Sequence, residues 1–366
     1  MFGNIYKDKK VLITGNTGFK GAWLSLWLLK MGAKVYGLAK DIPTEPSMFK
    51  ELSLSQTINH YENDVRNFDS VFQVIKEVKP DFVFHLAAQA LVSISYSDPI
   101  ETITTNVIGT ANILEALKQS NHHCVAIFIT SDKCYDNIEW EWGYKETDAL
   151  GGKDIYSGSK GAAELVFKSY YQSFFNKNNS NVKVATTRAG NVIGGGDWAK
   201  DRIVPDCMRA WSRNEIVEIR SPNATRPWQH VLEPLSGYLI LGQHLYNEGN
   251  KNGESFNFGP MSQHSYTVED LLKGLSKYWN IQDSSDAYNI TADIKFHEAG
   301  LLKLNCDKAL FHLDWLPNLS YEQLIDFTGS WYFNYYNEQI NMLDYSFEQI
   351  GMYEQCAANN RMSWTR

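Results

Sequence analysis

Two side chains four positions apart, Tyr156 and Lys160, have the types and spacing needed for proton transfer. Positions i and i+4 of a helix share a face, so the lysine ammonium would lie beside the tyrosine phenol. A positive charge there favours the phenolate, and we expect it to lower the tyrosine pKa from its reference value of about 10. Such a tyrosine can take the proton of an alcohol while a hydride leaves the same carbon. The pair is common on helix surfaces, so its meaning depends on the residues around it.

Three polar residues precede this pair at the end of an apolar run. Ser131, Asp132 and Lys133 directly follow residues 125–130, which have strand character. We expect the Ser131 hydroxyl to hold the oxygen of the reacting alcohol by a hydrogen bond.

A glycine-rich turn near the N-terminus indicates a nucleotide site. It joins a strand-like run at residues 10–14 to a buried helical pattern at residues 22–29. Glycine lets the backbone approach a pyrophosphate, whose charge then lies at the helix N-terminus. The spacing is G-x-x-G-x-x-G, which differs from the commoner G-x-G-x-x-G fingerprint. The candidate cofactor contacts in this turn are Gly15, Thr17, Gly18, Phe19 and Gly21.

Strand and helix patterns alternate along the following residues. Further strands are expected at residues 34–38, 81–86, 125–130 and 182–187, and helices at residues 70–78, 101–119 and 155–175. Continuous apolar strands separated by helices predict a parallel sheet covered on both faces. Ligands bind outside the carboxyl ends of such strands. Gly15, residues 85–88 and residues 131–133 occupy such ends and should therefore meet in one cleft.

Composition excludes several function classes. The 366 residues are 43% hydrophobic and carry a formal net charge of -8. This length fits one large or two modest domains. The acidic balance argues against nucleic acid or an anionic membrane as the partner. The N-terminal residues lack the pattern of a secretory signal, and the apolar stretch at residues 22–31 is too short to span a bilayer. Five scattered cysteines without C-x-x-C spacing predict free thiols in a reducing cytoplasm and no metal site.

The regular alternation stops near residue 189. We assign residues 1–189 to a dinucleotide-binding domain and residues 190–345 to a smaller substrate-binding lobe. Segments of one lobe can return to the other, so this boundary is soft. Helices of the smaller lobe are expected near residues 231–245 and 268–279. Residues 346–366 are assigned to a C-terminal arm, and the polar stretch from residue 349 is expected to be an arm or a frayed tail.

Several motifs, taken in order, resemble the extended short-chain dehydrogenase/reductases that act on nucleotide sugars. They are the glycine turn, Asp64-Val65-Arg66, His85-Leu86-Ala87-Ala88, Asn106-Val107-x-Gly109-Thr110 and Tyr156-x-x-x-Lys160. The resemblance implies an α/β fold with a Rossmann-type doubly wound parallel sheet and a smaller, interleaved C-terminal lobe. It also implies a bound nicotinamide dinucleotide contacted by Leu86, Ala87, Ala88, Tyr156 and Lys160, with Asp64 and Val65 at the adenine.

Four longer segments resemble the branch of this family that dehydrates CDP-glucose: residues 15–24, 131–135, 188–198 and 226–231. The resemblance implies CDP-glucose as the small-molecule substrate. The implied reaction oxidises C4, eliminates water across C5 and C6, and returns hydride to C6 to give CDP-4-keto-6-deoxyglucose. Such products feed deoxysugar and surface-polysaccharide synthesis in bacteria. By the same resemblance, Tyr156 with Lys160 deprotonates the C4 hydroxyl, Asp132 protonates the departing C6 hydroxyl, and Lys133 occupies the position of the C5 base.

Lys133 departs from the pattern of related dehydratases, which have a carboxylate at this position. Lysine's reference pKa of about 10.4 leaves it protonated at neutral pH. To act as a base it must be desolvated or lie near other positive charge. Alternatively, it stays charged and stabilises the enolate. Ser131 is a smaller departure, since many relatives have threonine there and the hydroxyl is kept.

The choice of cofactor depends on the end of the second strand, where many NAD-dependent relatives have an acidic residue that binds the ribose 2′-hydroxyl. That position is Ala39 here, followed by Lys40 and Asp41. Lys40 would favour a 2′-phosphate, whereas Asp41 could take the ribose role. The resemblance favours NAD, with NADP as the alternative. Asp64 could instead cap a turn or a helix.

For the substrate diphosphate the candidates are Arg202 and Arg226, because a guanidinium pairs bidentately with phosphate oxygens. Asn191 would hydrogen-bond the same group. Tryptophans of this region could stack on a base, although aromatic side chains mostly pack in cores; they are Trp198, Trp211 and Trp228. His85 and His230 are expected to be packed or hydrogen-bonded rather than catalytic.

Two other function classes remain open. A nucleotide-sugar 4-epimerase would share Tyr156, Lys160 and the glycine turn, and would not need an acid–base pair after Ser131. A non-catalytic cofactor-sensing protein commonly lacks the tyrosine or the lysine, and this chain has both. By the family resemblance, the helices at residues 101–119 and 155–175 would form the interface of a homodimer or homotetramer.

Overall fold

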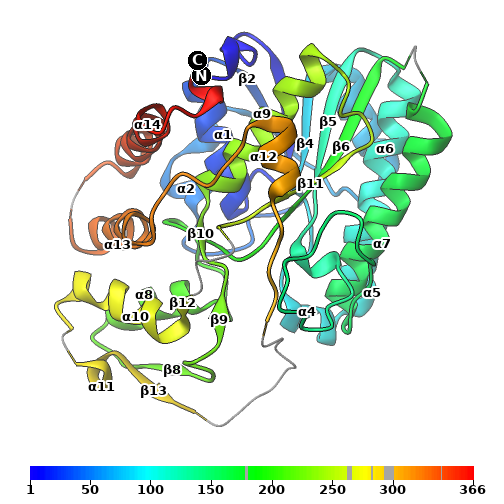
Figure 1. Cartoon of the computed structure of the whole chain (residues 1–366). Helices are drawn as coiled ribbons and strands as arrows, with labels where there is room; N and C mark the ends of the chain where they lie inside the picture. Colours follow the sequence, from blue (N-terminus) through cyan, green and yellow to red (C-terminus); the bar gives the residue numbers. More distant parts are fainter. Residues whose placement is uncertain (178–179, 262–265, 282, 292–300, 339) are drawn as a thin grey trace.

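A seven-stranded sheet forms the centre of the computed structural model, which describes residues 1–177, 180–261, 266–281, 283–291, 301–338 and 340–366. The strand order is β11-β6-β5-β4-β1-β2-β3, and every pair of neighbours is parallel (Figure 1). The strands are β1 (Lys10–Thr14), β2 (Lys34–Ala39), β3 (Asn59–Glu62), β4 (Phe82–His85), β5 (Cys124–Ile129), β6 (Val182–Ala189) and β11 (Ser255–Phe258). The order reverses between β1 and β4, which is where such sheets bind ligands.

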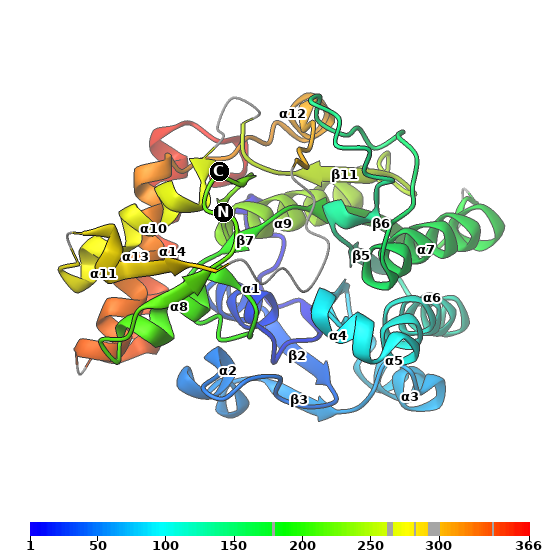
Figure 2. The same ribbon diagram turned by 90° about the horizontal axis from the view of Figure 1, so that it is seen from below.

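Alternate residues of the central strands point to opposite faces and build two separate cores. Val11 and Ile13 of β1 belong to the first core, and Leu12 belongs to the second. The first core is covered by α1 (Phe19–Lys30) and α9 (Leu232–Asn247), and the second by α3 (Phe68–Val78), α6 (Gly109–Ser120) and α7 (Ile155–Tyr170). Figure 2 shows the two sets of helices on opposite sides of the strands. The predicted doubly wound parallel sheet is confirmed.

The predicted strands are correct to within two residues at each end, but β3 and β11 are absent from the prediction. Both are four-residue edge strands with polar residues among the apolar ones, so neither has the continuous apolar pattern of a central strand. The predicted helix at residues 101–119 is interrupted. It consists of α5 (Pro99–Ile103), a π-helical turn (Thr104–Ile108) and α6. A second π-helical turn (Tyr171–Phe175) follows α7.

The second lobe is built from short strand pairs and helices. β7 (Val192–Ile193) pairs with β10 (Gln229–His230), β8 (Val217–Ile219) with β13 (Tyr288–Ile290), and β9 (Thr225–Arg226) with β12 (Tyr266–Thr267). The helices are α8 (Ile203–Trp211), α10 (Val268–Ser276), α11 (Ser284–Ala287) and α13 (Tyr321–Asn337). Short helices in the first lobe are α2 (Met48–Glu51) and α4 (Val92–Ser97).

The chain returns from the second lobe to the sheet. α9 and β11 lie within residues 190–345 yet belong to the sheet layers, and α12 (Asp307–Leu313) packs on both. The two lobes therefore interleave in sequence. The domain boundary at residue 189 stays a prediction.

The C-terminal residues are ordered and packed, so the expectation of a frayed tail is wrong. α14 (Met342–Asn359) lies against α1, where Glu354 accepts a hydrogen bond from the Trp27 indole at 2.9 Å and pairs with Lys30. Buried α14 side chains recur every three or four positions, at Ile350, Tyr353 and Ala357. This spacing forms an apolar face that the polar composition of the segment conceals.

The two chain ends meet beside this helix. The buried Trp364 ring stacks on Phe2 with centroids 4.9 Å apart, and the Gly3 amide donates to the Arg366 carbonyl at 2.9 Å. Tyr6 then packs on Phe82, the first residue of β4, with centroids 4.8 Å apart. The ends therefore lie together near the amino edge of the sheet (Figure 1).

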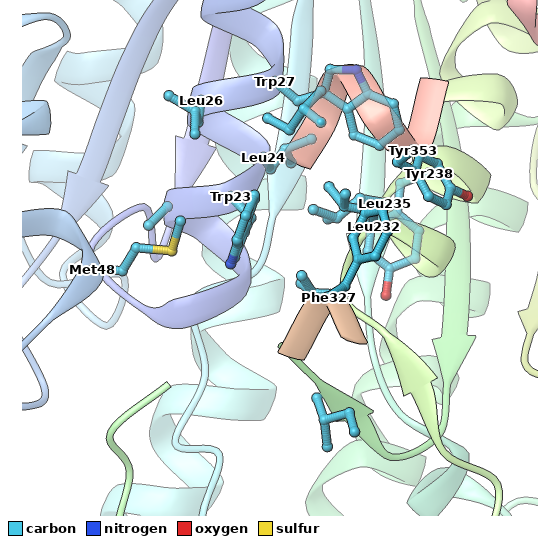
Figure 3. Close-up of a cluster of buried hydrophobic side chains, with 14 of the residues drawn as sticks. Trp23, Leu24, Leu26, Trp27, Met48, Leu232, Leu235, Tyr238, Phe327 and Tyr353 are labelled. Atoms are coloured by element: carbon cyan, nitrogen blue, oxygen red, sulfur yellow. The ribbon is translucent and has the colours of Figure 1, made fainter. Parts of the chain in front are cut away.

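The helix that begins at the glycine turn is anchored along most of its length. Its buried side chains Trp23, Leu24 and Trp27 face α9, as Figure 3 shows. The Trp23 indole also donates to the Gly195 carbonyl at 2.9 Å, which ties α1 to the segment after β7. α1 is thereby fixed between the sheet and the second lobe.

Candidate active site

The loops after β1 and β4 touch at the carboxyl edge of the sheet. Gly15 has a φ of +73°, and a Cβ there would lie 2.8 Å from the Ala87 backbone nitrogen. A Cβ on Gly21 would lie 2.2 Å from the Gly15 carbonyl oxygen, so both positions require glycine. Ala87 donates its amide to the Thr14 hydroxyl at 3.2 Å. The predicted meeting of these strand ends is confirmed.

The first turn of α1 is suited to an anion. Gly18 is the N-cap residue, and no side chain caps the helix. The first-turn N–H groups thus lack side-chain partners, and the helix dipole favours negative charge there. The Thr17 hydroxyl donates to the Asp41 carbonyl at 2.8 Å and ties the turn to the end of β2, while Phe19 packs partly buried against the first core. These features fit the pyrophosphate of a dinucleotide.

Asp64 and Val65 lie at the adjacent loop after β3. Asp64 accepts hydrogen bonds from Arg66, with the backbone amide at 2.9 Å and Nε at 2.8 Å. It does not cap α3, because Asn67 is the N-cap residue and accepts from the Ser70 amide at 3.2 Å. Val65 is buried against the start of α6.

Lys40 already has two carboxylate partners. Its Nζ lies 2.5 Å from Glu101 Oε1 and 3.7 Å from Asp41 Oδ2. The cation that would favour a 2′-phosphate is therefore largely compensated, and two acidic side chains lie at the end of β2.

Tyr156 and Lys160 are buried together at the start of α7, where Asp154 caps the helix by accepting from the Ser157 amide at 2.9 Å. Their exposed fractions are 8% and 6%. Lys160 Nζ lies 6.0 Å from the centroid of the Tyr156 ring. The structure confirms that the two side chains share one face of the helix.

Burial dominates the acidity of this pair. It raises the pKa of Tyr156 to about 12, and the hydrogen bond with Ser131 and the Arg202 charge oppose the shift. Burial also lowers the pKa of Lys160 to about 8, and the charge of Glu164 is among the opposing influences. The expectation that Lys160 brings the Tyr156 pKa below 10 is therefore wrong for the protein in this structure, because desolvation of the phenolate outweighs the attraction.

Ser131, Asp132 and Lys133 open a single 3-10 turn after β5. The Ser131 hydroxyl donates to Asp132 Oδ1 at 2.8 Å and accepts from the Lys133 amide at 3.2 Å. Burial raises the pKa of the Asp132 carboxyl, opposed first by the charge of Lys133. Asp132 is therefore a weaker acid here than a carboxyl in water, whereas the Lys133 side chain is only partly buried.

A buried ion pair beneath Lys160 was not predicted. The side chains of Glu164 and Arg188 are 2% and 3% exposed and bind each other through two contacts of 3.0 and 2.9 Å. Thr130 and Thr186 also donate their hydroxyls to this carboxylate, at 2.6 and 2.9 Å. The pair joins α7 to β6 and to the residue before Ser131. Its one sequence signal is that Glu164 follows Lys160 by one helical turn.

Asn106 is a second unpredicted support, although it belongs to a motif noted in the sequence. It lies in the π-helical turn before α6 and donates its amide to the Ser159 hydroxyl at 2.9 Å. Its carbonyl oxygen accepts from the Gln89 backbone amide at 2.9 Å. Asn106 thus connects the loop after β4 to the helix that carries Tyr156.

The three candidate diphosphate ligands differ in how near they lie to Tyr156 and Asp132. Arg202 acts electrostatically on Tyr156 and forms an ion pair with Asp197 at 2.7 Å. Asn191 follows Gly190, where a Cβ would lie 3.3 Å from Asp132 Oδ2. Arg226 lies farther along, on β9, and donates to its neighbour's carbonyl, that of Thr225, at 2.9 Å. The segment after β6 therefore brings Asn191 and Arg202 toward the acid and the tyrosine.

The two histidines and the tryptophans considered above are packed in the structure, and among these tryptophans Trp228 differs in lacking a hydrogen-bond acceptor within the described part of the chain. His85 bridges Thr14 and Thr110 at 2.7 and 3.2 Å, and burial lowers its pKa to about 3. Burial likewise lowers the pKa of His230 to about 3. Trp198 and Trp211 are buried, and their indoles donate to Tyr336 and to the Ala287 carbonyl. The buried Trp228 indole has no hydrogen-bond acceptor among the residues that the structure describes.

Three further observations concern the chain as a whole. The five cysteines are free thiols. In the described ranges, no group of three His, Cys, Asp or Glu side chains is arranged to hold a metal ion. No helix among the same residues is both long and apolar enough to cross a membrane.

Comparisons of the sequence with known proteins find matches over most of the chain. The profile of the family described as GDP-mannose 4,6 dehydratase matches residues 12–328. The CDP-glucose 4,6-dehydratase of Salmonella typhimurium is 48% identical over 332 residues, which cover 90% of this chain and 92% of that protein. The CDP-paratose 2-epimerase of Salmonella typhi is 26% identical over 88% of this chain and 99% of that protein.

Solved structures share the fold at lower identity. The dTDP-glucose 4,6-dehydratase DesIV of Streptomyces venezuelae, solved with NAD and TYD bound, aligns with a TM-score of 0.74 at 20% identity and covers 90% of this chain and 97% of that one. The UDP-glucose 4-epimerase of Thermotoga maritima aligns with a TM-score of 0.75 at 22% identity and covers 89% and 99%. At these identities the likeness establishes the fold.

Proposed function

This chain belongs to the GDP-mannose 4,6 dehydratase family, and from that premise we propose that it converts CDP-glucose to CDP-4-keto-6-deoxyglucose and water. One observation carries the choice of reaction. A buried carboxyl with a raised pKa, Asp132, and a lysine, Lys133, lie in one turn beside the Tyr156–Lys160 pair. An epimerase needs the pair and not the additional acid.

The dinucleotide residues support NAD as the cofactor, which when bound supplies the reversible hydride acceptor of the reaction. Gly15 and Gly21 let the glycine turn close tightly on itself and on the Ala87 backbone, and the α1 N-terminus suits the pyrophosphate. The charge of Lys40 is balanced by the carboxylates of Glu101 and Asp41. The 2′-phosphate of NADP would therefore meet two negative groups next to the lysine that could bind it. We therefore prefer NAD to NADP, as in the DesIV structure.

The first proton transfer belongs to Tyr156. As the phenolate it accepts the proton of the C4 hydroxyl and becomes the neutral phenol as the C4 hydride departs, while Ser131 holds the substrate oxygen. A phenol with a pKa of about 12 is a poor base at neutral pH, so added positive charge must lower that value in the working complex. The Lys160 ammonium and the Arg202 guanidinium are the protein cations nearest to this task.

The elimination belongs to the turn after β5. The C4 ketone acidifies the C5 hydrogen, and loss of that proton forms the enolate. Asp132 then protonates the C6 hydroxyl, which leaves as water. Lys133 contributes as the C5 base, or it stays charged and stabilises the enolate while another group or a water takes the C5 proton. The diphosphate is held by Arg202, Arg226 and Asn191, and this role for Asn191 is supported by its position next to Gly190, where a Cβ would lie 3.3 Å from Asp132 Oδ2.

A homodimer or larger homo-oligomer is part of the proposal. Apolar side chains are exposed on the two helical segments that the family resemblance assigns to the interface; they include Ile103, Ile108, Leu165 and Phe174. Exposed apolar groups along neighbouring helices favour association.

The test is to incubate the purified protein separately with CDP-, dTDP-, UDP- and GDP-glucose and to follow product mass. We expect the CDP sugar alone to lose the mass of one water. Turnover of only the dTDP or GDP sugar refutes the choice of nucleotide, whereas a product of unchanged mass with inverted C4 identifies an epimerase.

A further inference from the structure

Lys20 is a cation of the cleft to which the reaction above gives no role. It lies in the first turn of α1, between Phe19 and Gly21 of the glycine turn, and its side chain is partly buried. Within the part of the chain that the structure describes, its ammonium makes no hydrogen bond and no ion pair. A partly buried charge without a counter-ion is costly, so its retention requires a reason.

The charges around Lys20 come from three other elements of the site. Its ammonium acts electrostatically with Asp132 after β5, with Lys160 on α7, and with Asp197 and Arg202 after β7. Burial, followed by the Arg202 charge, lowers the pKa of Lys20 to about 8. The amine is therefore still mainly charged at pH 7.

Positive charge exceeds negative charge in this cluster. Asp197 is neutralised by Arg202 at 2.7 Å, and burial moves Asp132 toward its neutral form. The nearest other carboxylate on α7, Glu164, is bound to Arg188. The ammonium groups of Lys20 and Lys160 remain, and the cluster is suited to a polyvalent anion brought by a ligand.

We propose that Lys20 binds the diphosphate of the nucleotide sugar together with Arg202, and so positions the hexose between Tyr156 and Asp132. This inference rests on the proposed function, because it assigns the anion to that substrate. The backbone of the same turn serves the dinucleotide pyrophosphate at the helix N-terminus. The Lys20 ammonium is instead within electrostatic reach of Arg202 and Asp132, the residues that the proposed reaction assigns to the substrate.

The experiment compares Lys20→Met and Lys20→Arg with the wild type by calorimetric titration with CDP. We expect Lys20→Met to raise the Kd at least tenfold and Lys20→Arg to stay within threefold of the wild type, since the arginine keeps the charge. The amount of NAD released from each protein on denaturation should be equal. The matched control is Lys200→Met, which removes an exposed charge two residues before Arg202 and should leave the Kd unchanged.

Three results would overturn the assignment: unchanged CDP affinity in Lys20→Met, loss of NAD instead of CDP, or an arginine variant as weak as the methionine variant. If Lys20→Met does not fold, the proposal can still be tested by measuring proton uptake on CDP binding to the wild type and to Lys20→Arg. CDP binding at pH 8.5 should take up protons when measured in buffers of different ionisation enthalpy, and Lys20→Arg should reduce this uptake to the share that Lys160 contributes. No uptake in the wild type contradicts the proposal. Wild-type protein that binds CDP without dehydrating CDP-glucose contradicts the proposed function separately.

Discussion

Replacing Arg188 by methionine should destabilise the protein and change the protonation of Lys160. Glu164 is 2% exposed, so its carboxylate would lose its guanidinium partner while remaining buried. Breaking a buried ion pair in this way costs about 3–5 kcal/mol. The unfolding entropy of about 2.1 cal/mol/K per residue gives roughly 0.8 kcal/mol/K for 366 residues. A loss of about 4 kcal/mol therefore lowers Tm by roughly 5 °C.

The assay is thermal unfolding of Arg188→Met, Glu164→Gln and the double variant. Glutamine removes the charge and can still accept from Thr130 or Thr186, so the double variant should recover at least ~1.5 kcal/mol relative to Arg188→Met. The unpaired Glu164 charge should also raise the pKa of Lys160 above its value of about 8. A Tm of Arg188→Met within about 1 °C of the wild type, or strictly additive effects, would refute the reasoning.

Three more outcomes are expected. Gly21→Ala should lose bound NAD, because its Cβ would lie 2.2 Å from the Gly15 carbonyl. The matched control is Gly158→Ala, where the added Cβ meets no neighbouring atom within 4 Å; it should keep NAD and gain about 0.5–1 kcal/mol of helix stability. Equal NAD content in the two variants would contradict this prediction. Lys133→Met should abolish loss of water from CDP-glucose without releasing NAD, and near-normal turnover would remove Lys133 from the elimination. Burial raises the pKa of Glu233 from 4.5 to about 7, so between these pH values the native state binds a proton that the unfolded state has lost. The resulting contribution to folding stability, roughly 3 kcal/mol, is complete below pH 4.5 and is lost as the pH rises through 7. Glu233→Gln should therefore flatten the fall of Tm between pH 5 and pH 8, and an unchanged slope would exclude Glu233 as the source of that fall.

Continuous apolar runs explain why most of the fold is predictable from the sequence. β1, β4 and β5 are central strands buried on both faces, so their residues are apolar without alternation. The edge strand β3 has no such requirement, and its sequence Asn-His-Tyr-Glu gives no strand pattern. α14 escaped recognition for a related reason, because its buried face is assembled from scattered positions of a polar segment.

The candidate site is predictable where chemistry is local in sequence. Tyr156 and Lys160 are neighbours on one helix, and Ser131 to Lys133 form one turn, so spacing alone predicts their proximity. The partnership of Glu164 with Arg188 joins different elements and depends on strand register. The pKa of Tyr156 also depends on how far the folded chain excludes solvent from the phenol, and the presence of Lys160 in the sequence does not indicate this.

The contact between Phe2 and Trp364 has a practical consequence for engineering. Since Gly3 and Arg366 are hydrogen-bonded, a short peptide could close the polypeptide into a ring, and a circular permutant could be opened at an exposed loop. Purification tags on either terminus would emerge from the same spot, at the sheet edge opposite the catalytic turn, and would compete with the Trp364 stack for that space.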